Sequence, residues 1–155
     1  RRYAKSASLS FLLFFIVTGA ALAGGLSTTF IEETLEGLEP GKTYSIEEVN
    51  RRPLIVKNTT EDMTVDIAIE PELPVDYNLV PGYEPLPDTS WVMIEKTEFK
   101  EVGPGQSAET DVIISIPLEA GHRGKKYQIY IYSHTVGGAT FRTGLMSRVL
   151  IHISE

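Results

Sequence analysis

Apolar and polar residues alternate along much of the chain after Gly25. The alternation is regular in residues 63–70, 111–116, 127–132 and 149–154. A two-residue period turns one face of a β-strand inward, and no stretch after Gly25 keeps a 3.6-residue apolar period for three turns. We therefore expect half-buried strands rather than amphipathic helices.

Three shorter apolar segments complete the expected set of strands, at residues 54–57, at 91–94 and near 30–35. Turn-forming residues separate the apolar runs, at residues 40–41, 58–61, 103–105, 121–124 and 137–138. Seven or eight strands in roughly 125 residues predict an all-β fold, namely a two-layer antiparallel sandwich.

The same alternation predicts which side chains form the core. The inward row is expected to contain Val65, Ile67, Ile69, Trp91, Val112, Ile114, Ile116, Ile129, Ile131, Val149 and Ile151. On the strand at 127–132, this phase leaves Tyr130 and Tyr132 in a row on the outer face. Such a row suits carbohydrate or protein contact, unless the loop at 70–90 covers it.

The first 23 residues have the three parts of a secretory signal peptide. Basic residues within the first five positions precede an apolar run at 9–17, and Ala21-Leu22-Ala23 forms a small-residue cleavage motif. We expect a hydrophobic helix that is cleaved between Ala23 and Gly24. A retained membrane anchor is the alternative, because residues 6–31 contain no charged residue.

The chain then divides into a signal peptide or anchor at 1–23, an N-terminal strand or linker at 24–42, and one sandwich domain at 43–155. A length of 155 residues fits a single domain with a modest core. The net charge of −7 argues against a nucleic-acid binder. Because the chain has no cysteine, disulfides, thiolate zinc sites and cysteine nucleophiles are excluded.

Several short motifs follow one another between the apolar runs. They are Leu54-x-Val56-x-Asn58-x-Thr60, Val65-x-Ile67-x-Ile69-x-Pro71, Trp91, Gly103-Pro104-Gly105-Gln106-Ser107, Val112-x-Ile114-x-Ile116-Pro117 and Gly124-Lys125-Lys126-Tyr127. Over residues 43–153 the chain resembles the immunoglobulin-like domains of bacterial and archaeal cell-surface proteins. It is similar to the first domain of pilus chaperones, to major-sperm-protein-like domains and to the surface domains of WxL-interacting proteins.

The resemblance implies an immunoglobulin-like sandwich, an exported location and a role in binding or assembly. The chain departs from antibody-type domains because it has no cysteine pair. It also lacks the arginine and lysine anchor that a pilus chaperone needs, so the resemblance does not extend to that function.

No motif in the sequence supports catalysis. His122, His134 and His152 are scattered, and each is expected to be a solvated polar residue. Neither G-x-S-x-G nor H-E-x-x-H occurs, so we expect no enzymatic activity and no bound cofactor. Asn58-Thr59-Thr60 is a formal glycosylation acceptor, but we favour a turn in which Asn58 satisfies main-chain groups.

The segment at 70–90 is longer than a normal sandwich turn and contains five prolines. No basic residue occurs between Lys57 and Lys96. The carboxylates of this segment could supply oxygen ligands for calcium, although the prolines interrupt any regular ligand spacing; they are Glu70, Glu72, Asp76, Glu84 and Asp88. A solvated acidic loop is the expected state, with no metal bound.

Any binding function is expected in this loop and beside it. Proline stiffness lowers the entropy lost on binding, so the loop can present tyrosines to a partner. The candidate partner-binding residues are Tyr77, Tyr83, Glu84, Asp88, Tyr130 and Tyr132. The alternative is a crossover that only covers a sheet edge.

We therefore predict an exported, non-enzymatic binding or assembly module that is secreted, periplasmic or at the cell surface. Its expected partner is a protein or a cell-wall polysaccharide, with membrane contact only if residues 1–23 are retained. The alternative is a subunit of an extracellular filament, in which residues 24–37 would pair with a neighbour's open sheet edge. A small enzyme or a calcium-binding protein is a lesser alternative.

Overall fold

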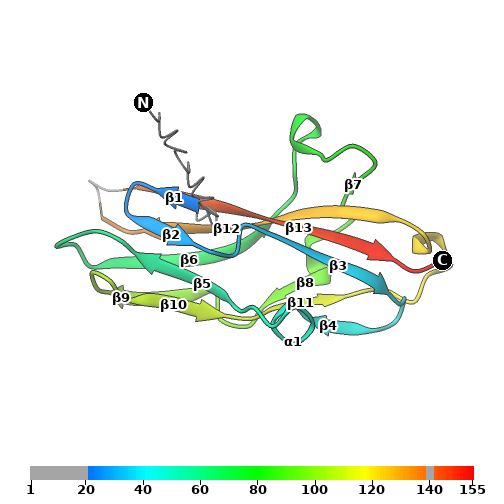
Figure 1. Cartoon of the computed structure of the whole chain (residues 1–155), viewed down its shortest axis with the longest axis horizontal. Helices are drawn as coiled ribbons and strands as arrows, with labels where there is room; N and C mark the ends of the chain where they lie inside the picture. The colour runs from blue at the N-terminus through cyan, green and yellow to red at the C-terminus, as the bar shows by residue number, and fades with distance from the viewer. Residues whose placement is uncertain (1–20, 139–141) are drawn as a thin grey trace, which may run out of the picture.

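The computed structural model describes residues 21–138 and 142–155. The strands lie in two layers, with β12 and β13 in one layer and β10 and β11 in the other (Figure 1). The larger layer is one sheet in the order β3-β13-β12-β6-β9, with β7 beside β12. Its strands are β3 (Glu32–Leu38), β6 (Val65–Glu72), β7 (Glu84–Pro85), β9 (Glu98–Val102), β12 (Lys126–Val136) and β13 (Gly144–Ile153).

The second layer combines two smaller sheets, with the orders β1-β2-β5-β10 and β4-β11-β8. Only Asp111 separates β10 from β11, so the two sheets share one continuous run of chain. The strands of this layer are β1 (Ala21–Ala23), β2 (Leu26–Thr28), β4 (Thr43–Ser45), β5 (Leu54–Asn58), β8 (Val92–Ile94), β10 (Ser107–Thr110) and β11 (Val112–Ser115).

A short helix, α1 (Ile46–Asn50), interrupts the second layer between β4 and β5. It begins at Ser45, whose side chain accepts the N–H of Glu48 at 3.0 Å. Oδ1 of Asp111 accepts the N–H of Glu47 at 3.1 Å, which ties α1 to the junction of β10 and β11. The remaining helical turns are η1 (Asp76–Asn78), η2 (Thr89–Trp91) and η3 (Ala120–His122). In the part of the chain that the structure describes, every helix is too short to cross a membrane.

The all-β sandwich predicted from the alternation is confirmed, but two of its strand pairs are parallel instead of antiparallel. These are β3 with β13 and β7 with β12. In the first pair, the chain passes from β2 in one layer to β3 in the other, and β3 lies beside the last strand, β13, in the same direction. The structure also contains more strands than predicted, since strands of two or three residues, such as β1, β4 and β7, are too short to show a period.

Residues 24–42 supply both β2 and β3, and they therefore contribute to both layers. Leu26, Phe30 and Leu35 of this segment are fully buried. The segment that the filament hypothesis treats as exchangeable thus pairs within its own domain. A hydrophobic helix was predicted for residues 1–23, and residues 1–20 of it lie outside the described residues. Residues 21–23 form β1, which pairs with β2.

The predicted core is confirmed. Ten of the eleven residues expected to point inward are buried, and Val65 is partly buried and packs against the same cluster. The turn interpretation of Asn58 is also confirmed. Its Oδ1 accepts the N–H of Thr60 at 3.0 Å, and its Nδ2 donates to the carbonyl oxygens of Met63 and Val102 at 2.8 and 2.9 Å.

Replacing Ile114 with Ala should lower the free energy of unfolding by about 2–5 kcal/mol, because the change leaves a cavity in the core. Ile114 is 0 % exposed and lies on β11 between Val92 and Tyr44. Urea denaturation measures the effect. The matched control is Met93→Ala on the neighbouring β8, where the side chain is 56 % exposed and the expected change is within about 0.5 kcal/mol. Equal losses in the two variants would contradict the register.

Candidate functional site

The loop formed by residues 73–88 lies against the outer face of the six-stranded sheet. It leaves the end of β6, rises beyond the sheet and returns through β7 beside β12 (Figure 1). Three outward-facing residues near this loop are buried although they lie outside the sandwich core: Gln128 is 0 %, Tyr130 8 % and Leu150 6 % exposed. The part of the loop that contacts Gln128, residues 78–86, therefore covers part of the sheet, and we call it the base of the loop.

Gln128 connects the sheet to this loop. Its Nε2 donates to the carbonyl oxygen of Asn78 at 2.9 Å, and its Oε1 accepts the N–H of Val80 at 2.9 Å. Its main-chain carbonyl accepts the N–H of Leu86 at 3.0 Å. One buried amide thus satisfies a main-chain acceptor and a main-chain donor of the loop, as a neighbouring strand would.

The returning half of the loop has its own polar contacts. The hydroxyl of Tyr83 hydrogen-bonds with Nε2 of His152, and Lys125 donates to Oε1 of Glu84 at 3.0 Å. Burial raises the pKa of the Tyr83 phenol, and two nearby carboxylates act in the same direction, so the phenol stays protonated at neutral pH. Asp88 accepts a main-chain N–H at 2.8 Å at the start of η2. The structure therefore gives Tyr83, Glu84 and Asp88 partners within the protein.

The three remaining candidate tyrosines differ in exposure. Tyr130 is buried, and its hydroxyl donates to the carbonyl oxygen of Asn78 at 3.4 Å. Tyr132 is half-buried, and its ring stacks on His134 with the centroids 4.5 Å apart. Tyr77, in contrast, is 87 % exposed. The predicted outward row on β12 thus exists, but the loop covers one of its two tyrosines.

The outgoing half of the loop presents an apolar surface, which we call the loop tip (Leu73, Val75 and Tyr77). Leu73 and Val75 are 41 % and 48 % exposed, whereas Pro74 between them is buried. The tip ends at η1, where the Gln128 contact begins. Because this contact orders the loop, the three apolar side chains can bury area against a partner at a small cost in conformational entropy.

A groove of about 310 Å³ adjoins the loop on the same face; its lining residues are Ile31, Glu32, Asn78, Tyr130, Met146 and Arg148. Arg148 donates to Oε2 of Glu32 at 2.8 Å, and its guanidinium lies over the ring of Tyr130, 5.9 Å from the centroid. The hydrogen bond to Tyr130 is the largest cause that raises the pKa of Arg148, and the interactions with Glu32 also raise it, so this residue remains charged. The groove therefore contains one fixed ion pair between apolar walls.

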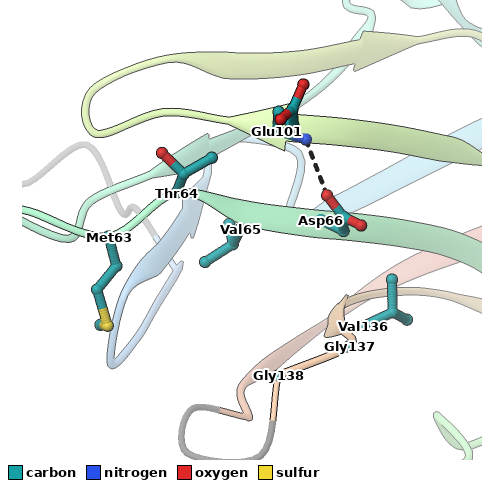
Figure 2. Close-up of a pocket in the computed structure, with 8 residues that line it drawn as sticks. All are labelled: Met63, Thr64, Val65, Asp66, Glu101, Val136, Gly137 and Gly138. Carbon is teal, nitrogen blue, oxygen red and sulfur yellow. Dashed lines mark hydrogen bonds between the residues drawn. The ribbon is translucent and has the colours of Figure 1, made fainter.

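A second hollow of about 420 Å³ lies near the start of β6 and the end of β12, and Figure 2 shows the residues that line it. Asp66 accepts the N–H of Glu101 at 2.8 Å, where Glu101 has a φ of 53° at a bulge in β9. This hydrogen bond lowers the pKa of Asp66, and the ion pair with Lys100 adds to the effect. Asp66 thus supports a strained bulge, and we place the candidate site at the groove instead.

The prediction that the histidines are solvated is wrong. Their side chains are only 15–22 % exposed, and each contacts one carboxylate; the pairs are His122 with Glu119, His134 with Glu70 and His152 with Glu36. Each imidazole also packs against an aromatic ring, which accounts for its burial. Within residues 21–138 and 142–155, no three His, Asp or Glu side chains lie close enough together to hold a metal ion.

Sequence reasoning missed Gln128 and Arg148. Both side chains point outward from β12 and β13, strands whose inward and outward faces were predicted correctly. The signal that could have identified them is that they are polar residues on the outward face. The burial of Gln128 could not be predicted from this signal, because the loop rather than the sheet provides its partners.

Comparisons with known proteins bear on the fold. No protein-family model matches the sequence, and no curated protein matches it. Among solved structures, the chain is similar to the ASH or PapD-like domain 7 of human CEP192, with a TM-score of 0.59 and 10% identity. The match covers 96% of this chain and 99% of that domain.

Two further solved structures share the fold. One is a Bacteroides ovatus protein for which carbohydrate binding has been suggested, with a TM-score of 0.56, 15% identity, and coverage of 81% of this chain and 36% of that chain. The other is the class 5 fimbriae chaperone CfaA, with a TM-score of 0.52, 12% identity, and coverage of 84% and 57%. The chain therefore has the PapD-like immunoglobulin fold that the sequence motifs resemble.

Replacing Gln128 with Leu should release the loop from the sheet. The change leaves the Val80 N–H without its partner and the Asn78 carbonyl with only the 3.4 Å hydrogen bond from Tyr130, which should lower the free energy of unfolding by about 1–3 kcal/mol. Limited proteolysis should then cut within residues 73–88 while the sandwich remains intact. Tyr77→Ala, a change on the same loop at a side chain that is 87 % exposed, is the control that should leave both properties unchanged. If the Gln128 variant resisted the protease as well as the wild-type protein does, this contact would not be what holds the loop to the sheet.

Replacing Glu101 with Gly should raise the free energy of unfolding by about 1 kcal/mol, because a side chain in the left-handed region is strained. Thermal and urea denaturation would measure the gain. Lys100→Gly, at a neighbouring position without positive φ, should destabilise the protein instead. A loss of stability in both variants would show that Glu101 is not strained.

Proposed function

We propose that the chain is an exported, non-enzymatic immunoglobulin-like module that binds its partner through the loop tip and the adjoining groove. The observation that carries this proposal is the ordered loop. Gln128 is fully buried and bonds the base of the loop, while Tyr77 remains 87 % exposed. An aromatic side chain on an ordered support is a common anchor of binding surfaces.

Export is supported by the signal-peptide pattern in residues 1–23. Cleavage after Ala23 would remove β1 and leave β2 as the outer strand of its sheet. The module would then act outside the cytoplasm, in the periplasm, at the cell surface or in the medium. Its partner would be a protein or a cell-wall polysaccharide. The likeness to a fimbrial chaperone and to a protein with suggested carbohydrate binding supports a role in binding or assembly.

A non-enzymatic role is supported by the chemistry of the groove. Its two charged side chains, Arg148 and Glu32, are paired with each other, and its remaining lining contains no serine, threonine, lysine or histidine. Covalent catalysis needs a nucleophile with an adjacent base. In the groove the carboxylate of Glu32 is held by Arg148, and the hydroxyl of Tyr130 donates to the carbonyl oxygen of Asn78, so the two do not form such a pair.

Export with cleavage predicts that the mature protein starts at Gly24. Intact-mass measurement of the protein recovered from the periplasm or medium of expressing cells tests this start. An Ala21→Lys, Ala23→Lys variant should remain uncleaved, because the cleavage motif requires small residues at these positions. Recovery of the full chain from membranes alone would show that residues 1–23 are retained as an anchor.

Binding predicts a loss when the loop tip becomes polar. The exported protein, fluorescently labelled, is incubated with cell-envelope fragments of the organism that encodes it. The Val75→Ser, Tyr77→Ser double variant should bind at least about tenfold more weakly, a loss typical of a removed interface anchor. Met93→Ser is the matched control, because it changes an exposed apolar residue on the other layer. Equal binding by both variants would place the partner site elsewhere, and no binding by the wild type would contradict the proposed function.

A further inference from the structure

The charges in the groove beside the loop cancel. Arg148 and Glu32 form an ion pair at 2.8 Å, and their side chains are 34 % and 46 % exposed. An anionic ligand would have to compete with Glu32 for the guanidinium, and a cationic ligand would have to compete with Arg148 for the carboxylate. The groove therefore favours a ligand without net charge that offers both hydrogen-bond donors and acceptors.

The electrostatic potential around the groove also disfavours an anionic ligand. Glu70 and Glu72 lie on β6 in register with Tyr132 and Tyr130, on the same outer face of the sheet. The whole stretch from residue 58 to residue 95 contains no basic residue. An acidic ligand approaching over β6 would meet repulsion from Glu70 and Glu72 before it reached Arg148, and the exposed Lys126 at the start of β12 offsets part of it.

The guanidinium of Arg148 is not fully satisfied by the protein. Its Nε is buried and, among the described residues, has no hydrogen-bond partner. Its Nη2 reaches the hydroxyl of Tyr130 only at 3.5 Å. The long contact at Nη2 leaves that donor able to gain from an additional acceptor.

The walls of the groove are aliphatic and partly open. Ile31 and Met146 are 36 % and 42 % exposed and border the ion pair. A pyranose ring matches this arrangement, because its C–H face is apolar while each hydroxyl at its edge can donate and accept a hydrogen bond. A groove of about 310 Å³ lies at the small end of ligand sites in proteins, which run from about 300 Å³ upward.

The same face continues along β12 and β13 beyond the groove. Met146 pairs with Tyr132 across these strands, and Tyr132 stacks on His134 with the ring centroids 4.5 Å apart. A ligand longer than one ring would therefore leave the ion pair and meet an aromatic pair. This succession fits a chain of sugar rings better than a single small molecule.

We propose that this groove binds a neutral oligosaccharide. One pyranose ring lies between the Arg148–Glu32 pair and Met146, and the next ring lies against Tyr132. The inference rests on the proposed function, because it names the chemical class of the partner that meets the same surface. A protein partner is the alternative that the following experiment distinguishes.

The first experiment is an NMR titration of the exported protein with two neutral tetrasaccharides whose rings all carry vicinal diols: cellotetraose and α-(1→6)-mannotetraose. At least one should shift the amide signals of residues 146–148 and the Nε–H signal of Arg148. Tetragalacturonic acid, a charged comparator, should bind at least tenfold more weakly. Arg148→Met and Glu32→Gln should each weaken binding at least tenfold. Met93→Ser, on the other layer, should leave it unchanged. Glu32→Gln keeps the shape of an exposed side chain, so misfolding would not explain its effect.

The second experiment treats the envelope fragments before the binding measurement. Periodate, which cleaves vicinal diols of sugar rings, should abolish binding, whereas protease treatment should not. Binding that is lost with protease but survives periodate would overturn the oligosaccharide proposal and leave the proposed function intact. Binding that survives both treatments would also overturn it. So would a titration in which no neutral tetrasaccharide shifts a signal of residues 146–148, if periodate also has no effect on binding to the fragments. The absence of any wild-type binding to fragments would contradict the proposed function itself.

Discussion

The two hydrogen bonds between the Gln128 side chain and the main chain of residues 78 and 80 decide which surface this sandwich presents. A loop with four prolines cannot form a regular ladder along its whole length, because proline lacks the N–H donor. Gln128 supplies the missing donor and acceptor from the sheet. The base of the loop is thereby fixed over Tyr130 and Leu150, and the loop tip is held clear of the sheet. The groove, whose wall includes Asn78, depends on the same contact.

The main features of the fold were predictable because the hydrophobic effect acts position by position along a strand. Alternation in β12 and β13 correctly placed Ile129, Ile131, Val149 and Ile151 in the core. The crossing of the chain from β2 to β3 was not predictable. Phe30 is fully buried at that crossing, but no periodic pattern surrounds it, and the parallel pairing of β3 with β13 follows from topology rather than from local sequence.

The candidate site was predicted less completely, for a physical reason. The acidic, proline-rich loop and the outward row of tyrosines were visible in the sequence, because each depends on local composition or phase. Their mutual contact was not visible, since it joins residues about fifty positions apart, as Gln128 and Asn78 show. That contact buries Tyr130 and leaves Tyr77 exposed, although both are tyrosines near the same loop. The same limit explains why His122 and His152, expected in solvent, are packed against the rings of Trp91 and Tyr83.

The central claim is that this loop is ordered before any partner arrives, and amide hydrogen exchange of the free protein tests it most directly. The N–H groups of Val80 and Leu86 bond to Gln128, and should exchange as slowly as those of β12. The N–H of Tyr77, at the exposed tip, should exchange much faster. Exchange of Val80 and Leu86 at the rate of Tyr77 would show that the loop opens freely, and the account of an ordered binding surface would be wrong.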